Sequence, residues 1–189
     1  MLVIKIGGTE GVNFDAVMAD VAAHVRAGQR LIVVHGGSGQ TNAISTQLGH
    51  PPQMVTSPSG FTSRYTDRQT LEIFAMETTG KISTLITERL QKLGVNAFSL
   101  SGVDGRLMMA RRKEAIRIID PATGKQRMLR DDYTGKIESV DGGLLRRSMM
   151  MVLGACLALG RGGGRGVFAD GRVDQPVAKA LAGAGTVIS

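Results

Sequence analysis

The sequence predicts an α/β fold, a mostly parallel open sheet flanked by helices, and three observations lead to this fold class. Two apolar segments rich in β-branched residues, 2–6 and 31–35, have the length of buried strands, and each ends at a glycine pair. The segment between them repeats its apolar residues at helical spacing. Because parallel strands need a long crossover connection, the three segments predict a parallel strand, helix, strand unit.

The helix of this first unit is predicted over residues 14–25. Asn13 is a candidate N-cap, because its side chain can accept a backbone N–H of the first turn, and Gly28 is a candidate stop. A second helix is expected to start at residues 40–42 and to end at Gly49. Both glycine turns then lie at the carboxyl edge of the sheet, where open α/β sheets bind ligands. The apolar residues at helical spacing are Phe14, Val17, Met18, Val21 and Val25.

The two glycine turns predict an anion site. Glycine has no Cβ, so the backbone can approach an anion closely, and the N–H groups that open a helix point at it. Lys5 precedes the first turn by one or two residues, within reach of the same anion. An alternative carries similar weight. With 26 glycines among 189 residues, glycine pairs also arise by chance, and a lysine near a strand end can simply extend to solvent.

The middle of the chain continues the alternation of strands and helices. A strand over 53–56 lies between proline-containing loops at 50–52 and 57–60. Residues 66–69 have the form of a capping box, and a long helix with one apolar face follows, ending at Gly94. The next strand, 96–100, precedes a turn at 101–105, where Ser101 or Asp104 can form hydrogen bonds at the same sheet edge. His35, at a strand end, is expected to be structural rather than a base.

Residues 106–130 predict a β-hairpin around a turn at 121–124. This segment has eight basic and two acidic residues, a surplus of six in a chain whose formal net charge is +7. The basic character of the protein is therefore local. Charge can protect an exposed hairpin edge from aggregation, or it can form a docking surface for an acidic partner, and the composition alone favours neither.

The last part of the chain is predicted to contain a strand at 136–140, a nearly all-apolar helix at 144–159 and a glycine-rich loop at 160–166. A strand at 167–169, a short helix at 177–181 behind Pro176 and a strand at 186–188 complete it. The glycines at 162–164 follow a helix rather than a strand, so they are interpreted as a stop signal. Cys156 is expected to lie in the core.

Length and composition indicate a globular chain of one or two domains. No apolar stretch is long enough to span a bilayer, and the chain begins without a basic-then-apolar leader. The single Cys156 excludes an intramolecular disulfide and suits a reduced compartment, so we expect a cytoplasmic protein. The sequence has no P-loop, dinucleotide-binding or zinc-ligand pattern, which predicts no protein-bound metal site. Nucleic-acid binding is disfavoured, because the chain has two Tyr and no Trp for base stacking.

Several motifs resemble those of a known family. They are VIKIGG at 3–8, VVHGGSGQTN at 33–42, SRYTD at 63–67, LSGVDG at 100–105 and GT at 185–186. Together they resemble the amino acid kinase family, in particular its acetylglutamate kinase branch. Within that branch, the Gly-Gly-Ser of the second turn, the run SRYTDRQTLEIF at 63–74 and FADGR at 168–172 are most similar to the LysW-aminoadipate kinases of bacterial lysine biosynthesis. The resemblance implies an amino acid kinase fold, a three-layer sandwich.

The resemblance also implies an activity. The enzyme would use ATP with Mg²⁺ to phosphorylate the side-chain carboxylate of an amino-blocked dicarboxylic amino acid, giving an acyl phosphate in lysine- or arginine-type biosynthesis. The implied acceptor is 2-aminoadipate bound to the carrier protein LysW, and free N-acetylglutamate is the alternative. Lys5 matches the catalytic lysine that stabilises the transferred phosphoryl group. Arg64 matches the residue that holds a substrate carboxylate, for which a bidentate guanidinium is suited.

The remaining site residues implied by the resemblance fall into three groups. The ATP phosphates would be bound by Gly7, Gly8 and Thr9. The acceptor would be bound by Gly36, Gly37 and Ser38 together with Arg64. An acidic carrier would dock on the basic hairpin at Arg111, Arg112 and Lys113. The long helix that ends before Gly94 would form the interface of a homodimer.

The resemblance is interrupted near residues 145–149. Residues 1–141 match as an acceptor-substrate half, and 142–189 match as a remnant of the nucleotide-binding half. Relatives carry at the interruption a long segment with much of the nucleotide pocket. Because a real deletion would leave the remaining strands without neighbours, we expect that the printed sequence omits a segment of the protein. If the deletion is real, the chain is instead a non-catalytic binding module that keeps only the acceptor side.

Overall fold

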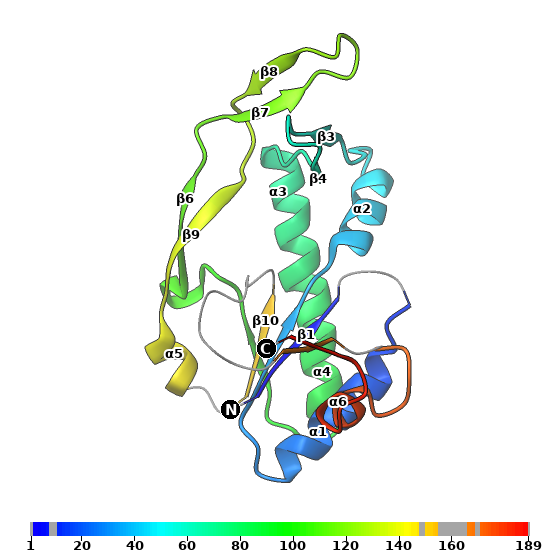
Figure 1. The fold of residues 1–189 in the computed structure, drawn as a ribbon. Coiled ribbons are helices and arrows are strands. Elements are labelled where there is room, and N and C mark those ends of the chain that lie inside the picture. Colours follow the sequence, from blue (N-terminus) through cyan, green and yellow to red (C-terminus); the bar gives the residue numbers. More distant parts are fainter. Residues whose placement is uncertain (1, 8–10, 148–149, 155–165, 169–170, 189) are drawn as a thin grey trace.

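The computed structural model describes residues 2–7, 11–147, 150–154, 166–168 and 171–188 of the chain. Its centre is a four-stranded sheet in which all neighbouring strands are parallel. The strands stand in the order β1 (Leu2–Ile6), β2 (Leu31–His35), β10 (Met150–Gly154) and β5 (Phe98–Leu100). Helices flank this sheet, as Figure 1 shows, which confirms the predicted fold class.

Helix α1 (Phe14–Arg26) forms where the sequence predicts it. The Asn13 side chain accepts a backbone N–H of the first turn at 3.0 Å. The chain turns away from the helix at Gly28, whose φ of +83° suits a residue without Cβ. The buried face of α1 shares a hydrophobic core with Leu31 and Val33 of β2. This packing completes the parallel strand, helix, strand unit.

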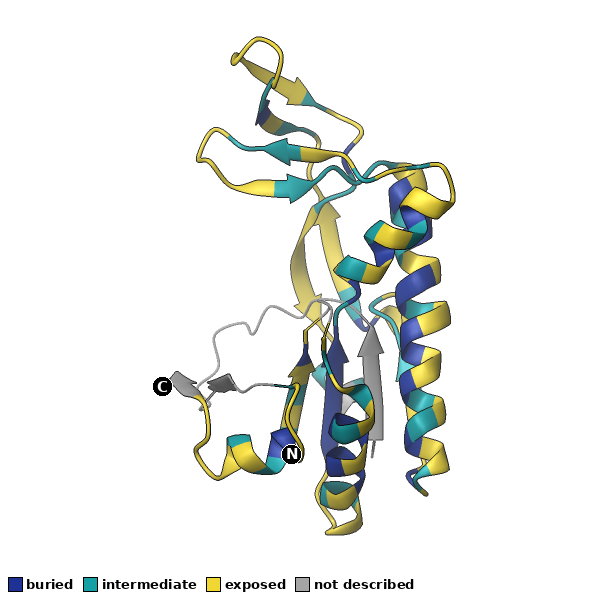
Figure 2. Ribbon diagram, turned by 90° about the vertical axis from the view of Figure 1, so that its right-hand side faces the viewer, coloured by how far each residue is buried: buried dark blue, intermediate teal, exposed yellow. Residues whose placement is uncertain are grey.

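A longer helical segment lies beside α1 in the same layer (Figure 1). It is built end to end from α3 (Arg68–Ala75), the π-helical η1 (Met76–Ser83) and α4 (Thr84–Lys92). Asp67 accepts the Thr70 N–H at 2.7 Å, so the helix begins one residue later than the predicted capping box requires. Its buried stripe, which faces the sheet in Figure 2, includes Ile82, Ile86 and Leu90.

The other face of the sheet is covered by fewer side chains. Ile32 and Val34 of β2 pack there on Leu107, with Leu144 beside them. Leu107 directly follows the short helix η2 (Asp104–Arg106), and Leu144 belongs to α5 (Gly142–Arg147). Val3 of β1 lies in register with Ile32 and is 46% exposed. Within the described ranges of the chain, the third layer therefore covers this face only in part.

Residues 144–159 do not form the single helix that the sequence predicts. Among the described residues, α5 ends at Arg147 and β10 lies between β2 and β5. A strand buried in a parallel sheet has the same all-apolar sequence as a buried helix, which is the physical reason for the wrong prediction. We expected that a real deletion would leave the remaining strands without neighbours. β10, however, lies between β2 and β5 and pairs with both. Cys156 and the glycines at 162–164 lie outside the described residues.

The basic segment is only partly the hairpin that the sequence predicts. β7 (Ile116–Ile119) and β8 (Gln126–Leu129) do pair around the predicted turn. The strand before them, β6 (Met108–Arg112), instead pairs with β9 (Gly135–Val140) beyond the predicted hairpin. β7 also pairs with β3 (Met54–Thr56), and β3 with β4 (Thr62–Arg64), a strand that the sequence analysis missed. In Figure 1 this ribbon of strands projects beyond the sheet.

The C-terminal segment is attached to α1. The Asp20 carboxylate of α1 accepts the N–H groups of Val177 and Ala178, at 2.6 and 2.8 Å, and so caps α6 (Pro176–Leu181) from outside. The neighbouring strands β11 (Gly166–Phe168) and β12 (Thr186–Ile188) are antiparallel, close to their predicted bounds. In the described part of the chain, no helix combines the length and the apolar character needed to cross a bilayer.

Candidate functional site

The predicted site residues gather at the carboxyl edge of the sheet. β1 and β2 are parallel and in register, with Ile6 opposite His35, and the Gly36 N–H donates to the Ile6 carbonyl at 3.1 Å. The two glycine turns therefore lie side by side, as the sequence predicts. β5 is parallel to them and ends at the same edge with Ser101.

Lys5 is exposed next to the first turn. It lies opposite Val34, on the incompletely covered face of the sheet, whereas its neighbours Ile4 and Ile6 contribute to the main core. Its ammonium is therefore in solvent and not held by the core. Gly7 is exposed after it, and Gly8 and Thr9, the other residues expected at the ATP phosphates, lie outside the described residues.

The second glycine turn opens helix α2 (Ser38–Gln47), which begins two to four residues earlier than predicted. Gly37 is its N-cap and, as a glycine, makes no side-chain cap hydrogen bond. The first N–H groups of α2 are thus free of the usual side-chain acceptor, at the positive end of the helix dipole. Ser38 is exposed in the first turn of the helix. This arrangement suits an anion at the expected acceptor position.

Gly37 also makes a close approach that the sequence analysis missed. An added Cβ would stand 2.6 Å from Glu77 Oε2 and 2.8 Å from Ile82 Cδ1, both on η1. Glu77 is 1% exposed, and its Oε2 lies 3.0 Å from the Thr41 hydroxyl of α2. The sequence signal for it was an acidic residue four positions after the buried Ile73, on the apolar face of the long helix.

Arg64 lies at the end of β4 beside α2. Its Nη1 donates to Asn42 Oδ1 at 2.6 Å, and its guanidinium stands 5.7 Å from the centre of the Phe74 ring. Burial lowers the pKa of Arg64 below its ordinary value, and the charge of Glu77 acts in the opposite direction. Its Nε is buried with no hydrogen-bond partner among the described residues. The guanidinium is therefore held in place with one donor still unsatisfied.

Two other polar residues at this edge are structural. His35 is buried and its Nε2 lies 2.7 Å from Ser83 Oγ. Burial lowers the pKa of His35 below its ordinary 6.5, so the ring is neutral at pH 7 and points into the core. After β5, the Asp104 carboxylate accepts both the backbone N–H and the hydroxyl of Ser101, at 2.6 and 2.8 Å. The Asp104 carboxylate therefore stabilises the turn at 101–105 in which it lies.

The three residues expected to dock a carrier differ in their surroundings. Arg111 is exposed and forms an ion pair with Glu138 of β9 at 2.8 Å. Arg112 donates to the carbonyls of Asp132 and Arg130 and stacks on the Tyr133 ring at 4.0 Å. It therefore holds the ribbon together, whereas Lys113 is exposed.

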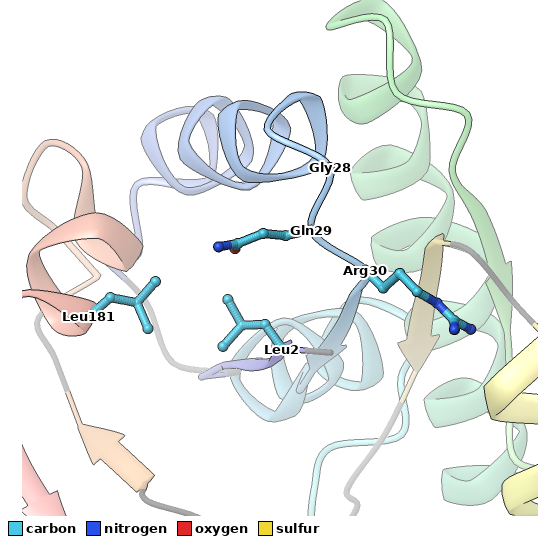
Figure 3. A pocket seen from close by; sticks show the side chains of 5 residues that line it. All are labelled: Leu2, Gly28, Gln29, Arg30 and Leu181. Carbon is cyan, nitrogen blue, oxygen red and sulfur yellow. The ribbon is translucent and has the colours of Figure 1, made fainter.

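A surface depression of about 450 Å³ lies at the opposite edge of the sheet. Figure 3 shows its lining at the start of β1 and before β2, with Leu181 of α6 on the other side. The depression lies at the amino ends of β1 and β2, whereas Lys5 and the glycine turns lie toward the carboxyl ends of these strands. The depression is not part of the candidate site.

Residues 1–165 match the model of the amino acid kinase family. A [LysW]-aminoadipate kinase of Deinococcus radiodurans is 39% identical in an alignment that covers 100% of this chain and 91% of the relative. A [LysW]-aminoadipate kinase of Thermus thermophilus is 48% identical over 145 residues, which are 77% of this chain and 53% of the relative.

The relatives are longer than this chain. The Deinococcus alignment has 269 positions, 80 more than the chain's 189 residues, so at least that many positions are gaps on this side. The chain spans about half the length of the Thermus relative and of a putative [LysW]-aminoadipate/[LysW]-glutamate kinase of Nitrosopumilus maritimus, 53% and 54% respectively. The last of these is 40% identical over 147 residues.

Two solved structures share the fold. A crystal structure of a Streptococcus mutans protein matches with a TM-score of 0.59 at 17% identity, over 80% of this chain and 57% of the other. An N-acetylglutamate synthase of Neisseria gonorrhoeae matches with a TM-score of 0.51 at 20% identity, over 80% of this chain and 34% of the other. At this identity the likeness concerns the fold alone.

Proposed function

Because the chain belongs to the amino acid kinase family, we propose that it is a cytoplasmic kinase that phosphorylates 2-aminoadipate on an acidic carrier protein. The reaction transfers the γ-phosphoryl group of ATP to the side-chain carboxylate of an acceptor whose amino group is blocked. Two relatives, 39% and 48% identical to this chain, are named [LysW]-aminoadipate kinases, and LysW is therefore the proposed carrier. The observation that carries the proposal is the shared sheet edge of Lys5 and both glycine turns, with Arg64 bonded to Asn42 of the helix that the second turn opens.

The chemistry brings anions together, so the protein must neutralise charge and align the reactants. An oxygen of the acceptor carboxylate attacks the γ-phosphorus, the bond to the bridging oxygen breaks, and ADP leaves. In this proposal Lys5 faces the transferred phosphoryl group, and the uncapped N–H groups of α2 face the acceptor. Arg64, held by Asn42, binds a second carboxylate of the acceptor.

The residues present fit the phosphate end of ATP. Lys5 and Gly7 are both exposed at the first turn, where phosphate oxygens can reach them. Mg²⁺ would accompany ATP and neutralise charge on its phosphate oxygens, a role that needs few protein ligands. We assign Gly7, Gly8 and Thr9 to the phosphates and no protein carboxylate to the metal.

Free N-acetylglutamate is the alternative acceptor, as in arginine-type biosynthesis. The two acceptors are separated by supplying ATP with either carrier-bound 2-aminoadipate or N-acetylglutamate and trapping the acyl phosphate with hydroxylamine. We expect the hydroxamate to form faster with the carrier-bound acceptor at equal concentration. Faster reaction of N-acetylglutamate would assign the chain to that substrate, and no hydroxamate from either would leave a binding module without catalysis.

The position of the nucleotide half is a separate proposal. We assign residues 1–141 to the acceptor half and 142–189 to the remainder of a nucleotide-binding half that lacks an internal segment near 145–149. The alignment with the Deinococcus relative has at least 80 positions that are gaps in this chain, which supports a missing internal segment. Intact mass decides whether the segment exists in the protein. A mass of 20.0 kDa means that it does not, and then the binding module becomes the preferred function.

The carrier is proposed to dock on the strand ribbon. Residues 106–141, which add β9 and the residues on either side of it, have nine basic and six acidic residues. Asp131, Asp132 and Asp141, which lie outside β9, therefore halve the surplus seen in the sequence. The positive charge that remains is concentrated toward β7 and β8, at 113–130, with five basic and two acidic residues. Opposed surface charges raise the association rate and are screened beyond about 8 Å at physiological salt.

Reversing Arg111 and Lys113 to Glu should raise KM for the carrier-bound acceptor on the order of 10-fold at low salt, with KM for ATP unchanged. Arg112 is left intact, because its hydrogen bonds hold the ribbon. Lys179→Glu on α6 is the matched control, an exposed charge reversal away from the ribbon. Steady-state kinetics at several salt concentrations make the measurement. Equal effects of the ribbon variant and the control on KM would contradict the proposal that the carrier docks on the ribbon.

A homodimer is proposed through the long helix of α3, η1 and α4. The outward side of this helix carries Met76 and Leu85, which are 53% and 39% exposed, whereas its other side is buried against the sheet. A two-fold interface would cover these apolar side chains. Sedimentation velocity at micromolar concentration should give twice the chain mass. A monomer under these conditions contradicts the assignment.

A further inference from the structure

A buried carboxyl group lies behind the second glycine turn, and the proposed chemistry gives it no task. Glu77 is 1% exposed on the π-helical η1, with Oε2 against Gly37. Its Oε1 is buried without a hydrogen-bond partner among the described residues. An unpaired buried carboxylate is costly to the folded state, so its presence at a binding turn requires a reason. A π-helical turn is itself a feature found frequently at functional sites.

The hydrogen bonds of the Thr41 hydroxyl depend on the protonation state of Glu77. The Thr41 hydroxyl lies 2.8 Å from the Gly37 carbonyl and 3.0 Å from Glu77 Oε2, but it has only one proton to donate. If Glu77 is protonated, it donates to Thr41, and Thr41 donates to Gly37, so both contacts become hydrogen bonds. If Glu77 is ionised, it competes with the Gly37 carbonyl for the single Thr41 proton.

The charges around Glu77 do not fully compensate its burial. Burial raises the pKa of Glu77 above its ordinary 4.5, while the hydroxyls of Thr41 and Thr78 and the charges of Lys81 and Arg64 act in the opposite direction. The neutral His35 is engaged with Ser83 on the same helical segment. The adjoining helices α3 and α4 carry charged residues, namely Arg68, Glu72, Glu88, Arg89 and Lys92. The segments α2, β5 and β10, which also pack against η1, contain no titratable residue.

We propose that Glu77 is a positioning residue of the acceptor site, which in its protonated form holds the Gly36–Gly37 turn in anion-binding geometry through Thr41. The inference rests on the proposed function and assigns an acceptor-binding role to a residue outside the pocket. Neutral Glu77 leaves the positive end of α2 and the Arg64 guanidinium available to the acceptor's carboxylates. Ionised Glu77 places a negative charge behind both and withdraws the Thr41 hydrogen bond from the turn.

This arrangement predicts a proton linkage. Acceptor affinity should be highest while Glu77 is protonated and should fall as pH rises through its pKa. By reciprocity, binding of an anionic acceptor must raise that pKa and take up a proton. At an effective dielectric constant of about 20 the interaction amounts to roughly a 10-fold change in Kd, equivalent to about one pKa unit.

The test measures binding of N-acetyl-2-aminoadipate to the full chain without ATP. Calorimetry between pH 5.5 and pH 9, in buffers of different ionisation enthalpy, gives both Kd and proton uptake. We expect Kd for the wild type to rise about 10-fold as pH passes through the raised pKa of Glu77, with proton uptake near the middle of the rise. Glu77→Gln should bind at high pH as the wild type does at low pH, since its amide can donate to Thr41, and should take up less proton.

Two variants separate positioning from a general effect on structure. Thr41→Val keeps the carboxyl group but breaks the link to Gly37, so it should bind weakly at low pH and show a reduced pH dependence. Glu72→Gln on α3 removes an exposed carboxylate that pairs with Arg68, away from the turn, and should match the wild type. The same pH profile and proton uptake in Glu77→Gln as in the wild type would overturn the inference.

The failure of this inference is distinguishable from failure of the proposed function. If the probe binds with the same affinity at every pH, the result supports the proposed acceptor class and contradicts the positioning role of Glu77. If the probe does not bind, the proposed acceptor is wrong, and the carboxyl ¹³C resonance of Glu77, assigned by its loss in Glu77→Gln, tests the remaining premise. A pKa at or below 4.5 for that resonance would contradict the neutral form.

Discussion

Replacing Lys5 by Ala is expected to lower kcat about 10²- to 10³-fold, the largest loss of activity from a single change in this chain. The transferred phosphoryl group carries negative charge in the transition state, and Lys5 is the exposed cation at the end of β1 beside the first glycine turn. A charge that acts mainly in the transition state affects kcat more than KM. Single-turnover kinetics with ATP and the carrier-bound acceptor measure the effect.

The fold should not change with this substitution. Lys5 lies on the partly covered face of the sheet, so the free energy of unfolding is expected to stay within about 0.5 kcal/mol of the wild type. Lys92→Ala, which removes another exposed ammonium at the end of α4, is the control and should leave kcat unaltered. A Lys5→Ala enzyme with wild-type kcat would refute the assignment of the catalytic lysine.

Replacing Gly37 by Ala is expected to destabilise the protein by about 1–3 kcal/mol and to raise KM for the acceptor. The added methyl would stand 2.6 Å from Glu77 Oε2 and 2.8 Å from Ile82 Cδ1. Both side chains end in a buried region and have little room to move. The cost arises from overpacking and not from backbone strain, because the φ of Gly37 is −154°. Denaturant unfolding and acceptor kinetics measure the two effects.

Two further variants make the Gly37 result specific. Gly80→Ala on η1 adds a methyl with no heavy atom within 4 Å, so its stability should equal or exceed that of the wild type. In a Glu77→Ala background the cost of Gly37→Ala should be smaller, because one of its two close contacts is removed. If the two costs simply add, the contact with Glu77 does not limit the size of residue 37.

The elements that depend on local pattern follow from the sequence. Asn13 and Gly28 bound α1 within one residue of the prediction, because a cap and a stop are properties of a few adjacent residues. The parallel pairing of β1 with β2 follows from the helix between them, and with it the meeting of the two glycine turns at one edge. Lys5 was expected beside the first turn, and it lies one residue before the end of β1. Arg64 was expected to bind substrate only from the family resemblance, and it is the last residue of β4.

Other features depend on contacts between distant segments. The sequence contains no signal that β6 pairs with β9 while β7 pairs with β3, since all four strands have similar propensities and partner choice depends on the whole sheet. The strand β10 was predicted as a helix, because an all-apolar segment is compatible with either when buried on all sides.

Charge shows the same division between sequence and tertiary structure. By itself the sequence determined the parallel unit, its two glycine turns and a basic segment after residue 105. Only the tertiary structure decided that Arg111 pairs with Glu138 of β9, that Arg112 holds the ribbon, and that Glu77 lies buried against Gly37. The reason is physical: helical and strand periods depend on neighbours a few residues apart, whereas the energy of a charge depends on every group that folding brings around it.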